Sequence, residues 1–195
     1  MPFDPPRITV FCGSRHGARP EFSDAARALG RTIAERGLGL VTGGGSVGLM
    51  GVVADAALEA GGEVIGVIPQ VLSRAEVAHH GLSELLVVDS MHTRKMRMNE
   101  LCGGFVALPG GIGTFEELFE VLSWRQLRIH AKPIGLYDVA GYWTGLRSLL
   151  DQAVAEGFLN PVHRSVLLRA DDPELLLDRM AAERIAAADP DAVEP

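Results

Sequence analysis

One stretch of ten residues decides how this chain folds: Leu108-Pro109-Gly110-Gly111-Ile112-Gly113-Thr114-Phe115-Glu116-Glu117. It follows an apolar run over 104–108 that predicts a buried strand, and it leads into 118–122, whose apolar spacing favours a helix packed on a sheet. The glycines in this strand-to-helix turn leave backbone N–H groups open to an anion. The start of the helix adds free N–H groups and the positive end of its dipole. We expect both glutamates in the first helical turn, and a phosphate cradle beside two acids indicates chemistry on a phosphorylated substrate.

Strand-like and helical runs alternate along almost the whole chain. The short apolar runs that predict strands are Arg7–Cys12, Gly39–Thr42, Glu63–Ile68, Glu84–Val88, Gly104–Leu108, Pro133–Tyr137 and Ser165–Arg169. The runs that predict helices are Glu21–Arg36, Leu49–Ala60, Met91–Leu101, Phe115–Leu127, Gly141–Glu156 and Pro173–Ala188. Such alternation is typical of βαβ units, and it predicts an α/β fold with a doubly wound parallel sheet of about seven strands and helices on both faces.

Length and composition fit one globular domain. The chain has 195 residues, of which 47% are hydrophobic and 22% are charged. This length and hydrophobic content are enough to bury a substantial core. We expect this domain to span 1–188 and the polar tail 189–195 to be disordered. The net charge of −7 argues against nucleic-acid binding, which usually needs a basic face. No apolar run approaches the ~20 residues that span a bilayer and the N-terminus is unlike a signal peptide, so we expect a cytoplasmic protein without a membrane partner.

Cysteines and histidines give no sign of a metal centre. Cys12 and Cys102 are the only cysteines, and their apolar surroundings indicate free buried thiols. The histidines are scattered or adjacent in sequence and lack the spacing of a zinc pair. The sequence therefore predicts no metal site.

Three glycine-bearing loops follow predicted strands, at 12–17, 42–48 and 109–117. Ligands of open parallel sheets bind beyond the carboxyl ends of the strands, so one shared crevice is expected, unless each loop merely turns the chain. Gly43, Gly45 and Gly48 match the dinucleotide fingerprint G-x-G-x-x-G. The next strand carries no acid at its tip to hold ribose hydroxyls, which disfavours NAD and leaves a phosphate contact open.

Two charged groups carry both a chemical and a structural interpretation. Thr114 and Glu117 have the spacing of a capping box, which would explain Glu117 without chemistry and leave Glu116 unexplained. Arg94 and Lys95 lie one turn into a predicted helix, near the same sheet edge as the glycine loops. Arginine can grip phosphate or ribose oxygens through its planar donor set, and the alternative is a solvated helix face.

These residues together resemble the Lonely Guy (LOG) family of cytokinin riboside 5′-monophosphate phosphoribohydrolases, whose members are often misnamed lysine decarboxylases. The resemblance runs from about Ile8 to about Leu168. Its most specific part is 109–117, which matches the family signature PGGxGTxxE, and 91–95 matches the accompanying MxxRK element. Supporting matches lie at 12–14, 43–51 and 123–127.

The resemblance implies a Rossmann-like homodimer that needs no metal or organic cofactor. The implied reaction is hydrolysis of the N-glycosidic bond of adenine-type nucleoside 5′-monophosphates, either N6-substituted cytokinin nucleotides or AMP, giving free base and ribose 5-phosphate. Arg94 and Glu117 match the catalytic positions, and Glu116 is the second choice for the essential acid. The substrate-binding positions are Gly13, Ser14, Gly44, Gly45, Glu76, Arg94, Lys95, Gly110, Gly111, Ile112, Gly113, Thr114, Phe115, Glu116 and Ser123.

This chain departs from the family pattern at two positions. Ser123 stands where threonine is familiar, which keeps the hydroxyl, and Arg15 stands where a second serine is frequent. Two other functions compete with hydrolysis. One is a non-catalytic nucleotide or cofactor carrier on the same fold, because fold alone does not fix activity. The other is amino-acid decarboxylation, for which only Lys95 and Lys132 could form the Schiff base that pyridoxal phosphate needs.

Overall fold

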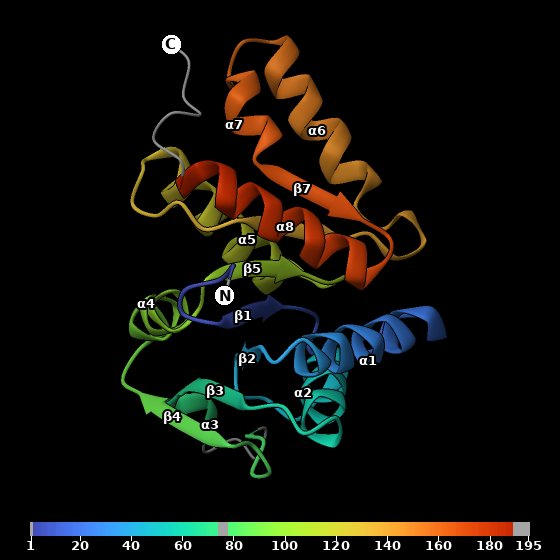
Figure 1. The fold of residues 1–195 in the computed structure, drawn as a ribbon, viewed down its shortest axis with the longest axis vertical. Coiled ribbons are helices and arrows are strands. Elements are labelled where there is room, and N and C mark those ends of the chain that lie inside the picture. The colour runs from blue at the N-terminus through green and yellow to red at the C-terminus, as the bar shows by residue number, and fades with distance from the viewer. Residues whose placement is uncertain (1, 74–77, 189–195) are drawn as a thin grey trace.

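A single parallel sheet forms the centre of the molecule. The computed structural model describes residues 2–73 and 78–188, and its seven strands lie in the order β4-β3-β2-β1-β5-β6-β7, from one end of the ribbon to the other in Figure 1. Their bounds are β1 Arg7–Phe11, β2 Gly39–Thr42, β3 Val64–Pro69, β4 Glu84–Val88, β5 Gly104–Ala107, β6 Ile134–Tyr137 and β7 Leu167–Ala170. Every neighbouring pair is parallel.

The strand order reverses between β1 and β5. The chain builds outward from β1 to β4, then returns to place β5 against the other side of β1 and continues to β7. Val10 pairs with Val106 and Phe11 with Ala107 in this central register. Where the connections after two neighbouring strands run to opposite sides of the sheet, a crevice opens beyond the carboxyl ends of those strands. This point of the sheet therefore positions the candidate site.

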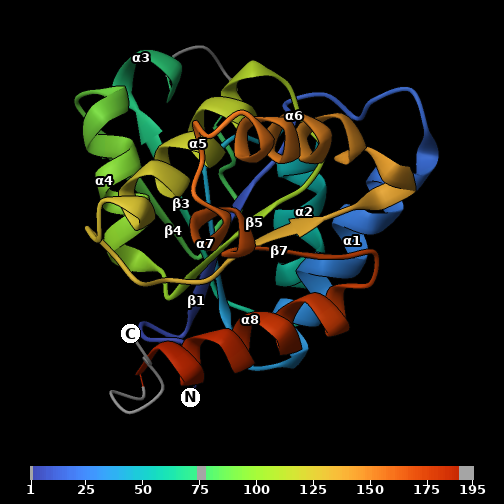
Figure 2. The same ribbon diagram turned by 90° about the horizontal axis from the view of Figure 1, so that it is seen from above.

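Helices cover both faces of the sheet (Figures 1 and 2). On one face α1, α2 and α8 pack through Leu29, Val53 and Leu177, and on the other α4, α5 and α6 pack through residues such as Met98 and Leu118. The helices are α1 Pro20–Glu35, α2 Gly48–Glu59, α3 Gln70–Ser73, α4 Met91–Leu101, α5 Ile112–Gln126, α6 Thr144–Ala155, α7 Pro161–Ser165 and α8 Pro173–Ala188, with a 3₁₀ turn η1 at Val139–Gly141. The predicted doubly wound α/β fold is confirmed.

The start of α5 differs from the prediction. The helix begins at Ile112, three residues before the predicted start, and Gly111 is its N-cap residue. Glu116 and Glu117 therefore lie in the second turn, and their expected place in the first turn is wrong. The capping box is also wrong, because Thr114 lies inside the helix instead of at its N-cap. Glycine disfavours helix interiors, so the two glycines at 111 and 113 hid the true start.

Smaller differences concern short elements. The helix predicted over 141–156 begins later, as α6 at Thr144, and η1, α3 and α7 were not predicted. The η1 turn, α3 and α7 are only three to five residues long, too short to show an apolar period. The predicted disordered tail 189–195 lies outside the described residues. Among the helices that are described, none is both long and apolar enough to cross a membrane.

Candidate active site

The three glycine loops meet backbone to backbone at the carboxyl edge of the sheet. The Gly13 N–H donates to the carbonyl oxygen of Pro109 at 3.0 Å, and the Leu49 N–H donates to the carbonyl oxygen of Gly13 at 3.0 Å. Gly48 has φ +63°, and a Cβ there would lie 2.2 Å from the carbonyl carbon of Ser14. Only glycine permits both this conformation and this approach. The loops therefore form one wall of a shared cleft.

The cleft has a volume of about 500 Å³. Its apolar side consists of Val47, Met50, Ile68 and Leu72. The other residues that line the cleft are Cys12, Gly13, Ser14, Arg15, Gly43, Gly45, Arg94, Gly111, Ile112, Gly113, Thr114 and Glu117. No side chain caps the N-terminus of α5, so its first N–H groups have no partner within the helix and are available to an anion in the cleft.

Arg94 is a buried arginine with spare donors. It lies in the second turn of α4. Ser90 is the N-cap residue of this helix, and its side chain accepts a hydrogen bond from the Thr93 N–H at 3.1 Å. The residue is only 8% exposed, and its Nε has no hydrogen-bond partner in the described part of the chain. A Cβ at Gly43 would lie 1.9 Å from Arg94 Nη2. The glycine loop after β2 therefore makes the room that this guanidinium occupies.

Glu117 faces Arg94 across the cleft wall. Its Oε1 lies 3.4 Å from Arg94 Nη2, and both side chains are 10% exposed. Burial raises the pKa of Glu117 to about 7, against the opposing charge of Arg94 and with a smaller contribution from Glu116. Burial disfavours the charged form of a carboxyl group. The carboxyl group can therefore change its protonation state near neutral pH, as catalytic acids and bases do.

Lys95 and Glu116 form a separate ion-pair cluster beside this pair. Lys95 Nζ lies 2.5 Å from Glu116 Oε1 and 2.9 Å from Glu120 Oε1. The Lys95 side chain is 13% exposed, and Glu116 is about half exposed. The cluster joins α4 to α5, which carry Arg94 and Glu117 respectively. Glu120 gave no signal in the sequence, since its pairing with Lys95 depends on how the two helices cross.

The predicted substrate-binding residues fall into three groups. Those that line the cleft are Gly13, Ser14, Gly45, Arg94, Gly111, Ile112, Gly113 and Thr114, and Gly110 lines a space that adjoins it. Those that do not line it are Gly44, Lys95, Phe115, Glu116 and Ser123. Phe115 instead packs edge-on against Trp143, with ring centroids 5.9 Å apart. Glu76 lies outside the described residues.

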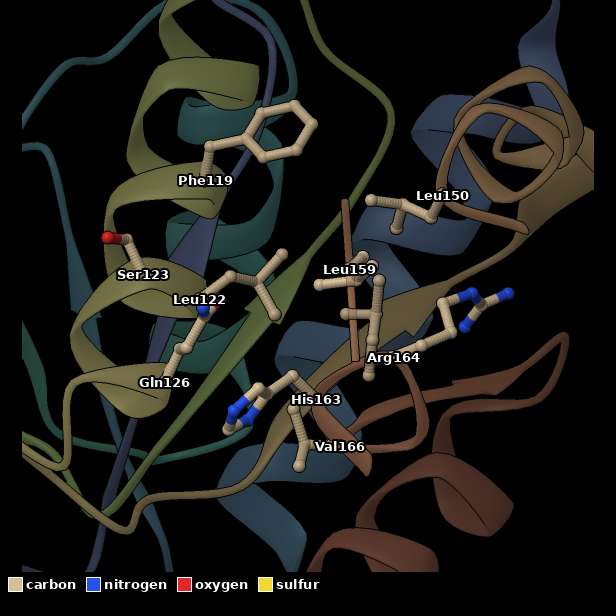
Figure 3. Close-up of a pocket in the computed structure, with 10 residues that line it drawn as sticks. Phe119, Leu122, Ser123, Gln126, Leu150, Leu159, His163, Arg164 and Val166 are labelled. Atoms are coloured by element: carbon tan, nitrogen blue, oxygen red, sulfur yellow. The ribbon is translucent and has the colours of Figure 1, made fainter. Parts of the chain in front are cut away.

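Ser123 lies on another side of α5. It borders a small apolar pocket of about 160 Å³ that α5 shares with α6, α7 and β7, where Leu122, Leu150 and Leu159 are found. In Figure 3 the Ser123 hydroxyl points away from the leucines of that pocket. Ser123 therefore cannot be grouped with Arg94 and Glu117 on the geometry of one chain.

Part of the lining was missed by sequence reasoning. Ile68 lies near the end of β3 and Leu72 lies in α3. From sequence alone, apolar residues at such places are ordinarily assigned to the core. Tyr142, whose hydroxyl donates to the Gly110 carbonyl, follows η1 far along the chain from the glycine loops. No pattern in the sequence marks Ile68 and Leu72 as lining the cleft, or Tyr142 as lining the space that adjoins it. Among the described residues, no cluster of three or more potential metal ligands occurs.

Comparison with known proteins identifies the family. The family model described as "Possible lysine decarboxylase" matches residues 50–180. The chain is 47% identical over 174 residues to LOGL2 of Oryza sativa subsp. japonica, named a probable cytokinin riboside 5′-monophosphate phosphoribohydrolase, across 89% of this chain and 71% of the rice protein. It is 45% identical over 174 residues to the cytokinin riboside 5′-monophosphate phosphoribohydrolase LOG7 of Arabidopsis thaliana, across 89% of this chain and 80% of that protein.

The chain therefore belongs to the Lonely Guy family of phosphoribohydrolases, an enzyme family, as the sequence motifs predicted. A solved structure with the same fold is the Moco carrier protein of Chlamydomonas reinhardtii, with a TM-score of 0.68 over 93% of this chain and 98% of that chain. The two are 23% identical, so this likeness establishes the fold alone.

Proposed function

We propose that this chain hydrolyses the N-glycosidic bond of adenine-type nucleoside 5′-monophosphates, releasing free base and ribose 5-phosphate. Its substrates would be N6-substituted cytokinin nucleotides and AMP. The single observation that carries the proposal is the buried Arg94–Glu117 pair beside an uncapped, glycine-rich helix N-terminus in one cleft. The names of the rice and Arabidopsis relatives support the same activity.

The glycine turn suits the 5′-phosphate. Gly111, Ile112 and Gly113 line the cleft at the start of α5, where free N–H groups and the helix dipole favour an anion. The phosphate is remote from the bond that breaks. Its binding holds the ribose in place, and fixed geometry of this kind lowers the barrier to reaction.

Glu117 is the acid that the geometry favours for the chemistry. Breaking the bond between ribose and adenine builds positive charge on the sugar, and an ionised carboxylate beside it stabilises that charge or activates the attacking water. Glu117 lines the cleft, whereas Glu116 is paired with Lys95 outside it. Arg94, with an unused buried Nε, has donors left for a ribose or phosphate oxygen.

The competing functions receive less support. Amino-acid decarboxylation requires a lysine that is free to form a Schiff base with pyridoxal phosphate, but Lys95 is held by Glu116 and Glu120, and Lys132 donates to the carbonyl oxygen of Asn99. Neither lines the cleft. A non-catalytic carrier would need the anion cradle but not a buried carboxyl group whose pKa is raised to about 7.

We also propose a homodimer that covers the apolar surface around Ser123. Phe119 is 41% exposed, and Leu127 and Ile129, just beyond α5, are 66% and 60% exposed. A second copy seated there would bury these side chains, and the proposed role of Ser123 in substrate binding would then require the partner's cleft.

The cytoplasmic location and the lack of nucleic-acid, membrane, metal or cofactor partners remain predictions.

Liberated base tests the proposed reaction. The protein is incubated with AMP, isopentenyl-AMP and the corresponding nucleosides, and free base is separated by chromatography. We expect base from the monophosphates and little from the nucleosides, because these lack the anion that the glycine turn holds. Prolonged incubation that yields no base from any monophosphate would support the carrier instead.

A further inference from the structure

Glu117 borders a second, much smaller space besides the cleft. Residues of β1, β5, α4 and α5 line this inner pocket, and its charged residues are Lys95, Glu117 and Glu120. The other residues that line it are Phe11, Phe105, Val121 and Trp124. About 10 Å³ of the pocket is open to the centre of a water molecule, which is room for one water molecule. The inner pocket therefore brings Glu117 together with two charged side chains that do not line the cleft.

Lys95 is held at the inner pocket chiefly by Glu120. Its Nζ lies 2.5 Å from Glu116 Oε1 and 2.9 Å from Glu120 Oε1. Glu116 is half exposed, whereas the side chains of Lys95 and Glu120 are both mostly buried. Because solvent weakens an exposed ion pair, Glu120 is the partner that fixes the ammonium group. This pair also joins α4 to α5, which lie next to each other in Figure 2.

One donor of Lys95 is left for the pocket. A lysine ammonium has three N–H donors, and within the described part of the chain Glu116 and Glu120 accept two of them. A buried water molecule needs two to four polar partners. A water molecule in the inner pocket can accept from the third Lys95 donor and donate to the carboxyl groups of Glu117 and Glu120. Such a water molecule connects Glu117 to the Lys95–Glu120 pair.

Charged groups on two helices surround Glu117. The cations of α4 lower the pKa of Glu117, and the neighbouring acids of α5 raise it. Burial raises the pKa of the nearby Cys12 thiol and keeps that group neutral. The titratable and charged groups around Glu117 are thus Arg94, Lys95, Glu116, Glu120 and the neutral thiol of Cys12. Because Glu120 does not line the cleft, a change at Glu120 alters the charge near Glu117 without altering the cleft wall.

We propose that Glu120 is a positioning residue for hydrolysis of the N-glycosidic bond, which holds the Glu117 carboxyl group through Lys95 and one water molecule in the inner pocket. The inference rests on the proposed function, in which Glu117 is the acid beside the reacting bond. Glu120 itself does not touch the substrate. Misplacement of a reacting group slows the chemical step even where the substrate binds normally, so Glu120 acts on kcat more than on KM.

Steady-state kinetics of base release from isopentenyl-AMP test this role. Glu120→Ala should lower kcat at least about tenfold and change KM less than about threefold. Glu120→Gln keeps a side chain of the same size that can still accept a hydrogen bond, so it should retain more of the wild-type kcat. The matched control is Glu100→Gln, which removes an exposed carboxylate of α4 that pairs with Arg97 and should change neither constant. A kcat in Glu120→Ala equal to that of the control overturns the proposal.

The pKa of Glu117 gives a second readout, measured by carbon-13 NMR titration of its carboxyl carbon without nucleotide. The signal is assigned by its loss in Glu117→Gln. Glu120→Gln removes a negative charge and should lower the pKa of Glu117, whereas Lys95→Met removes a positive charge and should raise it, each by at least about 0.5 pH unit. Loss of packing alone would admit water in both variants and lower the pKa in both. Movement in the same direction in the two variants therefore contradicts the proposal.

The two measurements separate failure of this proposal from failure of the proposed hydrolysis. If the wild-type protein releases no base, the proposed hydrolysis is wrong, and opposite movements of the Glu117 pKa still support the link from Glu120 to Glu117. If base is released and the pKa of Glu117 is the same in Glu120→Gln as in Glu100→Gln, Glu120 does not position Glu117.

Discussion

Glu117 Oε1 lies 3.4 Å from Nη2 of Arg94, and each side chain is 10% exposed. The two residues come from different helices, α5 and α4, which begin at the carboxyl edge of the sheet on the same face. A buried arginine with a spare Nε beside a carboxyl group of raised pKa is an incompletely neutralised arrangement. A ligand that supplies oxygen acceptors to the arginine would complete it.

Removal of either partner should abolish base release and leave the fold in place. Glu117→Ala deletes the carboxylate that stabilises charge on the ribose, and Arg94→Ala deletes its cationic partner. We expect kcat/KM for isopentenyl-AMP to fall by at least about a hundredfold in each variant, the usual size of such catalytic contributions. Far-ultraviolet circular dichroism checks the fold. Turnover within about threefold of the wild-type value would remove that residue from the mechanism.

The pKa of Glu117 also predicts how stability depends on pH. In the folded protein the pKa is raised from 4.5 to about 7, so its contribution to stability is fully present below pH 4.5 and is lost as the pH rises through 7. Glu117→Gln cannot ionise and escapes this loss. The free energy of unfolding of Glu117→Gln, relative to wild type, should therefore rise by up to about 3 kcal/mol from pH 4.5 to 8.

Urea unfolding of the two proteins across this pH range measures the difference. The linkage argument uses only the change with pH, so any fixed effect of the substitution on packing cancels. Parallel curves for Glu117→Gln and wild type between pH 4.5 and 8 would show that the carboxyl group titrates at its ordinary pKa in the folded protein.

The rate of base release should depend on pH in the opposite sense to the stability contribution of Glu117, which falls as the pH rises. If the ionised carboxylate does the chemistry, kcat/KM for the free enzyme rises with pH and levels off above the pKa of Glu117, about 7. The measurement is the initial rate of base release at low substrate concentration from pH 5 to 9. Activity that instead falls as the pH rises through 7 would mean that Glu117 acts in its protonated form, as a general acid.

The sequence predicted the sheet and the position of the cleft because both depend on local patterns. Short apolar runs marked all seven strands, and parallel strands direct their carboxyl ends to one edge, so loops at 12–17, 42–48 and 109–117 had to meet. The start of α5 was missed because helix propensity penalises Gly113. The turn before the helix is held by hydrogen bonds that Pro109 and Gly110 accept from distant residues, Gly13 and Tyr142.

The remaining features depend on how elements cross in space. Glu120 approaches Lys95 only because α4 and α5 lie side by side, and Tyr142 reaches Gly110 from a turn beyond β6. Ser123 matches a family position in sequence, yet it lies on a different side of α5 from the cleft. A one-dimensional pattern contains no information on these approaches.

Gly43 should also matter for activity, although it has no side chain. A Cβ at this position would lie 1.9 Å from Nη2 of Arg94, so Gly43→Ala must displace the guanidinium from Glu117. We expect kcat/KM to fall at least about tenfold. The control is Gly145→Ala in α6, where a Cβ meets nothing within 4 Å; it should keep full activity and gain about 0.5–1 kcal/mol of stability from helix propensity. Equal activities of the two variants would show that the position of Arg94 against Gly43 is not required for turnover.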